Sequence, residues 1–258
     1  RDLVRSRGLG DVYKRQVKDV FLKLDFGNSY RTGKPVFDDI FMRLPVSIKV
    51  AFLGMLLATV MGLPLGVLSA VKQYSPADSF LRVASTVLVA MPTFWLAMLL
   101  ILVFALYLGW LPAGGALTWQ SYILPTITVG VPYGSKVLRM TRSTMLEEIR
   151  QDYVRTARSK GVPEKKVIYG HALKNALLPV ITTIGSAFGA ILGGSVIAES
   201  VFNLPGLGSL IVLSIKAKDT PSVLASVLLL AVFFALIMLI VDLVYAFIDP
   251  RIKAKYAK

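Results

Sequence analysis

The stretch Val223-Leu-Ala-Ser-Val-Leu-Leu-Leu-Ala-Val-Phe-Phe-Ala-Leu-Ile-Met-Leu-Ile-Val241 decides the fold class of this chain. It carries no charged residue and has the length of about 20 residues that a helix needs to cross a bilayer. Further long apolar stretches precede it, and the whole chain of 258 residues is 55% hydrophobic with a mean hydropathy of +0.66. The sequence therefore predicts an all-α, polytopic bundle of transmembrane helices.

About five spans are predicted. The second exceeds one bilayer crossing and contains Pro92, so it should tilt, kink or project. The third is short and contains two prolines, and we expect it to continue as an amphipathic helix past Arg139 and Arg142. The five ranges are Val50–Val71, Val83–Leu111, Tyr122–Val137, Leu177–Val201 and Val223–Ile248.

Basic-rich and basic-poor connections alternate along the chain, as consecutive crossings require under the positive-inside rule. This pattern places the C-terminus in the cytoplasm and residues 17–46 outside, ahead of a transmembrane domain at 47–258. The net charge of +14 is then a membrane-topology signal, and a nucleic-acid partner is not predicted. We interpret residues 1–16 as a non-native arm, and expect that an amino-terminal span is missing.

The sequence offers little for catalysis or metal binding. It has no cysteine and a single histidine, His171, so neither a metal site nor a cofactor is predicted. No phosphate-binding glycine loop and no nucleophile–base pair stands out, and we predict no enzyme activity. Two carboxylates, Glu199 and Asp242, fall in or near spans. For Asp242, near the end of its span, local pairing or snorkelling is favoured over proton relay.

A polar, basic segment at about 145–176 separates the third and fourth spans. Met145–Lys160 has helical character, because apolar or small residues recur at four-residue steps. The segment Gly161-Val-Pro-Glu164 should break that helix, and a second helix at about Lys165–Ala176 should lead back to the membrane. Two helices around a glycine turn form a compact knob; a solvated basic loop is the alternative, but it needs neither the apolar face nor the turn.

Two further segments stand out. Glycines at four-residue spacing in the fourth span are predicted to pack against another helix, or to line a pore or subunit interface. After that span, a turn rich in proline and glycine precedes a short apolar helix at about Leu210–Ile215. We interpret this turn as an external gate, with a plain loop as the alternative. The packing glycines are Gly185, Gly189 and Gly193, and the gate residues are Pro205, Gly206, Leu207 and Gly208.

The basic segment resembles the cytoplasmic loop of binding-protein-dependent ABC importer permeases. The resemblance rests on Ala157 and Gly161, followed by His171, Leu173 and Leu178-Pro179. Other segments are similar to the dipeptide, oligopeptide and nickel branch of these permeases. These are Leu138–Glu147, Asp152–Gly161, Pro205–Gly208, Asp242–Tyr245 and Asp249–Arg251. The sequence departs from the family pattern in two ways. Arg155 and Thr156 stand where the general loop has Glu and Ala, and an additional amino-terminal span of the family is lacking.

The resemblance implies a permease subunit of an importer in a bacterial or archaeal inner membrane, with ATP chemistry left to a partner. The implied partners are a second homologous permease, two cytoplasmic ATPases, an external substrate-binding protein and the lipid bilayer. Peptides, nickel complexes, glutathione and sugars stay open as substrates. A stand-alone secondary transporter or channel is the alternative, and would need more ionisable groups in its spans. The implied ATPase-docking residues are Arg155, Thr156, Ala157, Lys160, Gly161, Val162, Pro163 and Glu164.

Overall fold

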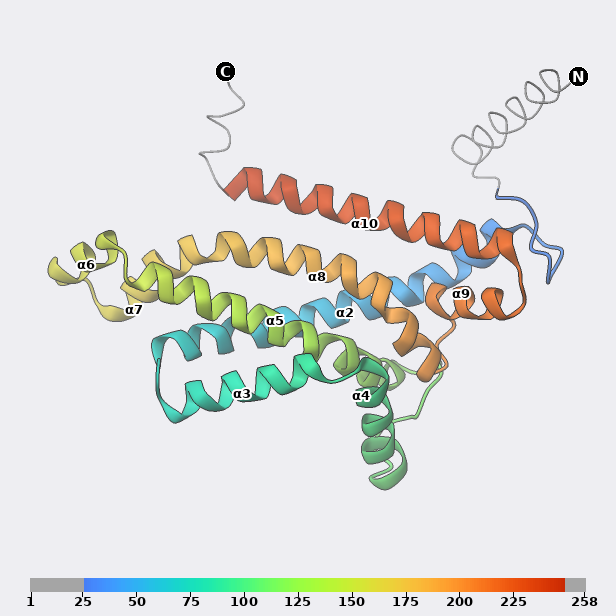
Figure 1. Ribbon diagram of the computed structural model, residues 1–258, viewed down its shortest axis with the longest axis horizontal. Helices are drawn as coiled ribbons and strands as arrows, with labels where there is room; N and C mark the ends of the chain where they lie inside the picture. Colours follow the sequence, from blue (N-terminus) through green and yellow to red (C-terminus); the bar gives the residue numbers. More distant parts are fainter. Residues whose placement is uncertain (1–25, 249–258) are drawn as a thin grey trace, which may run out of the picture.

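A computed structural model describes residues 26–248 of the chain, apart from the side chains at positions 194, 242 and 244–248. The predicted arm at 1–16, the first part of the external segment and the Asp249-Pro-Arg251 motif lie outside the described residues. Long helices lie side by side in one elongated bundle, with the short helices at its two ends (Figure 1). The elements are α2 (Val36–Val71), α3 (Pro76–Ala90), α4 (Thr93–Leu100), π-helix η1 (Ile101–Tyr107), 3-10 helix η2 (Trp119–Tyr122), α5 (Ile123–Ile149), α6 (Asp152–Ser159), α7 (Glu164–Lys166), π-helix η3 (Val167–Ala172), α8 (Leu173–Val201), α9 (Leu207–Lys216) and α10 (Thr220–Ile248).

The all-α membrane bundle is confirmed. Three helices in the described part of the chain are long and apolar enough to cross a membrane, and a bent pair makes a fourth if counted as one span. The third predicted span does not meet this test, although it lies in the 27-residue helix α5 and continues past Arg139 and Arg142 as predicted. The charged residues of α5 lower its mean hydropathy below that test. Its place in the bundle is shown instead by its packing against the other helices.

The second predicted span is not one continuous helix. Helix α3 ends at Ala90, and the helix formed by α4 and η1 leaves it at 103°. Met91 is extended (φ −68°, ψ 129°), because a residue that precedes a proline is disfavoured in the α-helical region. Pro92 therefore breaks the span, and α4 projects from the bundle (Figure 1).

Helices α2 and α5 pack through small residues. Gly54, Ala58, Gly62 and Gly66 recur at four-residue spacing on α2, and all are buried. A Cβ added to Gly66 would lie 2.6 Å from Cβ of Thr141, and one added to Gly62 would collide with the backbone oxygen of Gly134. Small side chains at this spacing let two membrane helices approach closely.

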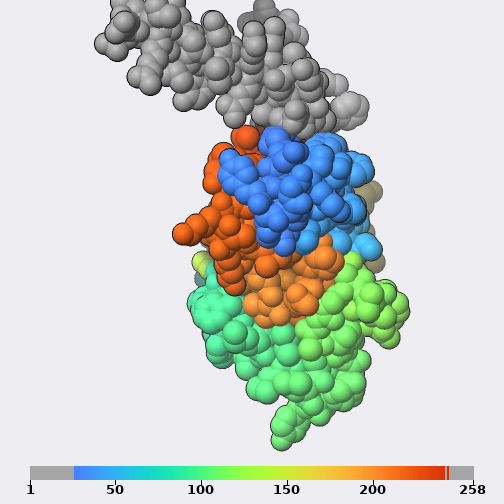
Figure 2. Space-filling model, turned by 90° about the vertical axis from the view of Figure 1, so that its right-hand side faces the viewer, coloured from blue at the N-terminus to red at the C-terminus, as the bar shows by residue number. Residues whose placement is uncertain are grey.

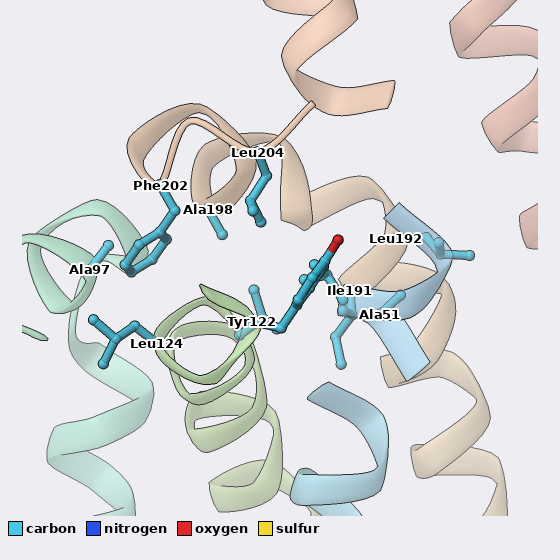
Figure 3. Packing of buried hydrophobic residues seen from close by; sticks show 11 residues of the cluster. Ala51, Ala97, Tyr122, Leu124, Ile191, Leu192, Ala198, Phe202 and Leu204 are labelled. Carbon is cyan, nitrogen blue, oxygen red and sulfur yellow. The ribbon is translucent and has the colours of Figure 1, made fainter. Parts of the chain in front are cut away.

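The largest apolar cluster among the described residues joins the middle of the bundle to the end where α8 meets α9. Tyr122, at the start of α5, lies among side chains from α2, α8 and the turn after α8, with Ala51, Ile191 and Leu204 near its ring (Figure 3). Phe202 is fully buried, and its carbonyl accepts a hydrogen bond from the Gly115 N–H at 2.9 Å. The loop that follows η1 is thereby attached to the end of α8.

The segment before α2 is tied to the α9–α10 turn. Asp219, only 1% exposed, accepts hydrogen bonds from the Ser29 hydroxyl at 2.5 Å and the Tyr30 N–H at 3.0 Å. Figure 2 shows this end, where the blue residues that begin the described chain lie against orange helices α9 and α10. Helix α2 begins at Val36, so the predicted external segment at 17–46 contains more than two turns of helix.

Candidate functional site

The basic segment folds differently from the two predicted helices. Helix α5 ends at Ile149, Gln151 is extended (φ −68°, ψ 151°), and α6 begins at Asp152, so Met145–Lys160 is not a single helix. The second predicted helix is not separate either, because α7, η3 and α8 follow one another from Glu164 to Val201. The knob (residues 152–166) thus consists of α6, the Gly161 turn and α7.

Val154 attaches the knob to the bundle. Its side chain is fully buried in an apolar cluster with Met145 of α5, Val67 and Ala70 of α2, and Val167 at the start of η3. An eight-residue helix is marginal on its own in water, so this contact accounts for much of the stability of α6. The cluster therefore joins α6 to residues of α2, α5, η3 and α8.

Gly161 ends α6 in a Schellman motif. The N–H of Val162 donates to the carbonyl of Ala157 at 3.2 Å, and the N–H of Gly161 donates to that of Arg158 at 2.9 Å. Gly161 has φ +75°, a region that costs little for glycine but strains other residues. Ala157 and Val162 both pack against the Val154 cluster, which completes the apolar contact typical of this motif.

An ion pair closes the turn on its outer side. Arg158 donates to the two carboxylate oxygens of Glu164 at 2.7 and 3.1 Å, across the Gly161 turn. The hydrogen bond to Glu164 raises the pKa of the Arg158 guanidinium. The side chains of Arg158 and Glu164 are 38% and 59% exposed, so solvent screens the pair and it stabilises the turn only modestly. Burial and a hydrogen bond to Glu148 raise the pKa of the Tyr153 hydroxyl at the base of α6.

The eight predicted docking residues divide into two groups. Ala157 and Val162 are half-buried against the bundle, because the Schellman contact turns them inward, and their docking role stays a prediction. The remaining six form an exposed surface with charged groups around a glycine turn. They are Arg155, Thr156, Lys160, Gly161, Pro163 and Glu164.

The predicted gate residues are mostly buried. Leu207 is inaccessible, and its N–H donates to the Ser47 hydroxyl of α2 at 2.8 Å. A Cβ on Gly208 would lie 2.5 Å from the Cα of Val196, and one on Gly206 would collide with the Glu199 carboxylate. Only Pro205 is exposed, so the turn is a packed joint between α8 and α9 rather than an open loop. The short helix predicted after it is present as α9.

Glu199 organises this joint, a role that the sequence did not indicate. The carboxylate is fully buried, and it accepts hydrogen bonds from the Ser195 hydroxyl at 3.0 Å and the Ser209 N–H at 3.1 Å. Ser209 lies in the first turn of α9, where a negative charge is stabilised by the free N–H groups. The one feature of the sequence that could have indicated this role of Glu199 is Ser195, one turn earlier on α8.

The α8 glycines do not share one environment. Added Cβ atoms at Gly185 and Gly189 would collide with Val241 and Phe234 of α10, whereas one at Gly193 would meet nothing within 4 Å. Among the described residues, Gly193 therefore makes no close helix contact. No group of three or more histidine, aspartate or glutamate side chains within residues 26–248 is placed to hold a metal ion.

Apolar helices packed through glycines, with a compact helical knob at one end, define a polytopic membrane protein. Residues 62–254 match the model of the "Binding-protein-dependent transport system inner membrane component" family, and the chain belongs to that family. It is a permease subunit of an ABC importer and a multi-pass inner-membrane protein.

Two relatives agree with this assignment, and two solved structures share the fold. The glutathione transport system permease protein GsiC of Escherichia coli K12 is 42% identical over 231 residues, which is 90% of this chain and 76% of GsiC. GsiC of Salmonella typhimurium is 42% identical over 234 residues, 91% and 76% of the two chains. The fold is similar to a chain of the inward-facing MetNI methionine ABC transporter, with a TM-score of 0.68, 17% identity and 82% and 96% coverage. An amino acid ABC transporter gives a TM-score of 0.60, 15% identity and 83% and 94% coverage.

Proposed function

We propose that the knob is the docking element for a cytoplasmic ATPase, and that this chain forms an importer with a second homologous permease, two ATPases and an external substrate-binding protein. In this assembly the knob and the C-terminus face the cytoplasm. ATP hydrolysis takes place in the ATPases, and this chain converts their closure into movement of α2, α5 and α8.

The arrangement of the knob carries this proposal. Six exposed residues surround the Gly161 turn, while Val154 on the other side of the same short helix is fully buried against three long helices. A partner that binds the outer surface can therefore push on the membrane helices through one rigid contact. A loop held only by its ends would not transmit such a force.

The opposite end of the bundle is the proposed external side. There Asp219 ties the segment before α2 to the α9–α10 turn, and Asn203 and Pro205 are the exposed residues between α8 and α9. We propose that the substrate-binding protein docks on this face, with the joint as its fixed support. The relatives named for glutathione transport favour small peptides as substrates.

Gly161→Asp tests the docking role. The substitution strains the backbone at φ +75° and places a carboxylate on the exposed surface, where nothing lies within 4 Å. We expect the ATPase that co-purifies with the tagged chain to fall by roughly tenfold or more, as it does when a central interface contact is lost. ATP-dependent uptake should fall with it, while the amount of chain in the membrane stays unchanged.

Gly109→Asp is the matched control. Gly109 also has a positive φ, +62°, and also has no neighbour within 4 Å, but it lies in the loop after η1, away from the knob. This variant should keep the ATPase. Equal retention of the ATPase by Gly161→Asp and Gly109→Asp, with uptake intact in both, would reject the docking assignment.

A further inference from the structure

An open groove with a volume of about 500 Å³ runs between α3 and α5. It lies towards the end of the bundle that carries the knob, since α3 begins just after α2 ends beside the Val154 cluster (Figure 1). Its lining combines two kinds of side chain. Arg82, Arg139 and Arg142 supply positive charge, and Val83 and Val87 supply an apolar wall.

Arg142 is held in place by a buried carboxylate. It donates to the two oxygens of Asp78 at 2.7 and 2.9 Å, and Asp78 also accepts from the Ser69 hydroxyl at 2.5 Å. Asp78 is inaccessible, so this pair fixes one guanidinium at the groove and joins α3 to α5. The position of this cation does not depend on an external ligand.

The groove keeps an excess of positive charge. Arg82 and Arg139 are exposed and have no ion pair with any acidic side chain in residues 26–248. Three guanidinium groups therefore stand against the single carboxylate of Asp78. A guanidinium presents several N–H donors in a planar fork that matches the oxygens of a phosphate group.

The apolar wall distinguishes a lipid from a free anion. Val83 is 64% exposed and Val87 47% exposed, and Phe80 on the preceding turn of α3 is 70% exposed. Such a stripe on a membrane helix is suited to acyl chains. Long basic side chains near a helix end extend toward the headgroup region, and basic pockets between membrane helices on the cytoplasmic side bind anionic headgroups.

We propose that the groove binds one anionic glycerophospholipid from the leaflet on the knob side. Arg82, Arg139 and the free face of Arg142 contact the headgroup phosphate, and the acyl chains lie along Val83 and Val87. The bound lipid bridges α3 and α5, the helix that leads into the knob. The importer is thereby sensitive to the anionic lipid content of its membrane.

The test is native mass spectrometry of the intact, detergent-purified transporter titrated with palmitoyl-oleoyl phosphatidylglycerol or the matching phosphatidylcholine. Wild-type protein should hold one phosphatidylglycerol more tightly than phosphatidylcholine. The double variant Arg82→Gln, Arg139→Gln leaves the Asp78–Arg142 pair intact and should weaken phosphatidylglycerol binding by about thirtyfold. Lys165→Gln, Lys166→Gln removes the same charge from exposed positions on the knob and should leave binding unchanged.

Four results would overturn the proposal. The first is equal binding of the two lipids by the wild-type protein. The second is equal loss of binding in the two double variants. The third is displacement of phosphatidylglycerol by millimolar inorganic phosphate, which would make the groove a site for a free anion. Loss of the second permease from the Arg82→Gln, Arg139→Gln variant, without any lipid dependence, would assign the groove to a subunit interface instead.

Discussion

At the scale of single residues, Val154 and Gly161 determine the geometry of the knob. Val154 holds α6 to three long helices, and Gly161 reverses the chain so that its exposed residues gather on one side. The sequence indicated the Gly161 turn, because glycine next to Val-Pro is a strong break. It did not indicate that Ala157 and Val162 face inward, because that depends on the Schellman contact with a distant cluster.

Val154→Ala should loosen the knob without unfolding the bundle. Removing two buried methyl groups costs about 1–3 kcal/mol, and the cost falls on a short helix that has few other buried contacts. Hydrogen–deuterium exchange should show faster exchange in residues 152–162. Arg155→Ala, on the exposed side of the same helix, is the control and should leave exchange unchanged.

Gly62→Ala and Gly193→Ala should have opposite effects on thermal stability. The added methyl at Gly62 collides with the backbone of α5, and overpacking of this kind costs about 1–3 kcal/mol. At Gly193 the methyl meets nothing within 4 Å, so the higher helix propensity of alanine should stabilise the protein slightly. Melting of the detergent-purified chain measures both, and equal shifts would contradict the α2–α5 contact described here.

At the scale of elements, proline and glycine account for most of the features that could be predicted from the sequence. Tertiary contacts account for the features that could not. Pro92 breaks the second span by excluding the helical conformation at Met91, although the sequence left open whether the helix would tilt, kink or project. The break between α5 and α6 has no proline or glycine nearby, and it exists because Val154 packs back on the bundle. The spacing of Gly54, Gly62 and Gly66 is a pattern from which the α2–α5 contact could have been predicted.

The joint after α8 shows why burial was harder to predict than a turn. Pro205 and Gly206 indicate a turn in any sequence, and α9 follows it as expected. Burial of Gly206, Leu207 and Gly208 depends on Glu199 folding back to the first turn of α9 and on Ser47 from a distant helix. Neither contact has a local signature in the sequence.

The anchor between residues 26–35 and the α9–α10 turn should be lost only in acid. Burial opposes ionisation of Asp219, but hydrogen bonds from Ser29, Ser222 and the Tyr30 N–H more than offset it and lower the carboxyl pKa. Because the folded pKa is the lower one, the stabilisation is fully present above the unfolded value of about 4 and is lost as the pH falls through the folded value. Exchange of the Tyr30 amide, corrected for intrinsic rate, should stay protected from pH 7 to pH 5.

Asp219→Asn removes the negative charge of this anchor and keeps the shape of the side chain. The variant should show faster Tyr30 exchange already at pH 7, because a neutral amide accepts more weakly than a carboxylate. A protection factor that falls between pH 7 and pH 5 in the wild-type protein would contradict the lowered pKa.

At the scale of the whole molecule, the knob and the Asp219 anchor lie at opposite ends of one bundle, and α2 joins them. The fold class and the family could be predicted from the apolar runs and the motifs of the basic segment. The path of the chain through the bundle could not be predicted. Glycine contacts and the Asp78–Arg142 pair position α3, α5 and α8, and these contacts join residues far apart in the sequence.

Cysteine cross-linking in native membranes tests the docking role of the knob most directly, because the chain has no cysteine of its own. In the assembled importer, Thr156→Cys on the exposed side of α6, labelled with a maleimide-linked benzophenone, should be joined to the ATPase on illumination, because the excited benzophenone inserts into a nearby C–H bond of the partner. Leu117→Cys, at a position 99% exposed in the loop between η1 and η2, should not be joined to it. Cross-linking of the ATPase to Leu117→Cys, or its absence from Thr156→Cys, would contradict the account.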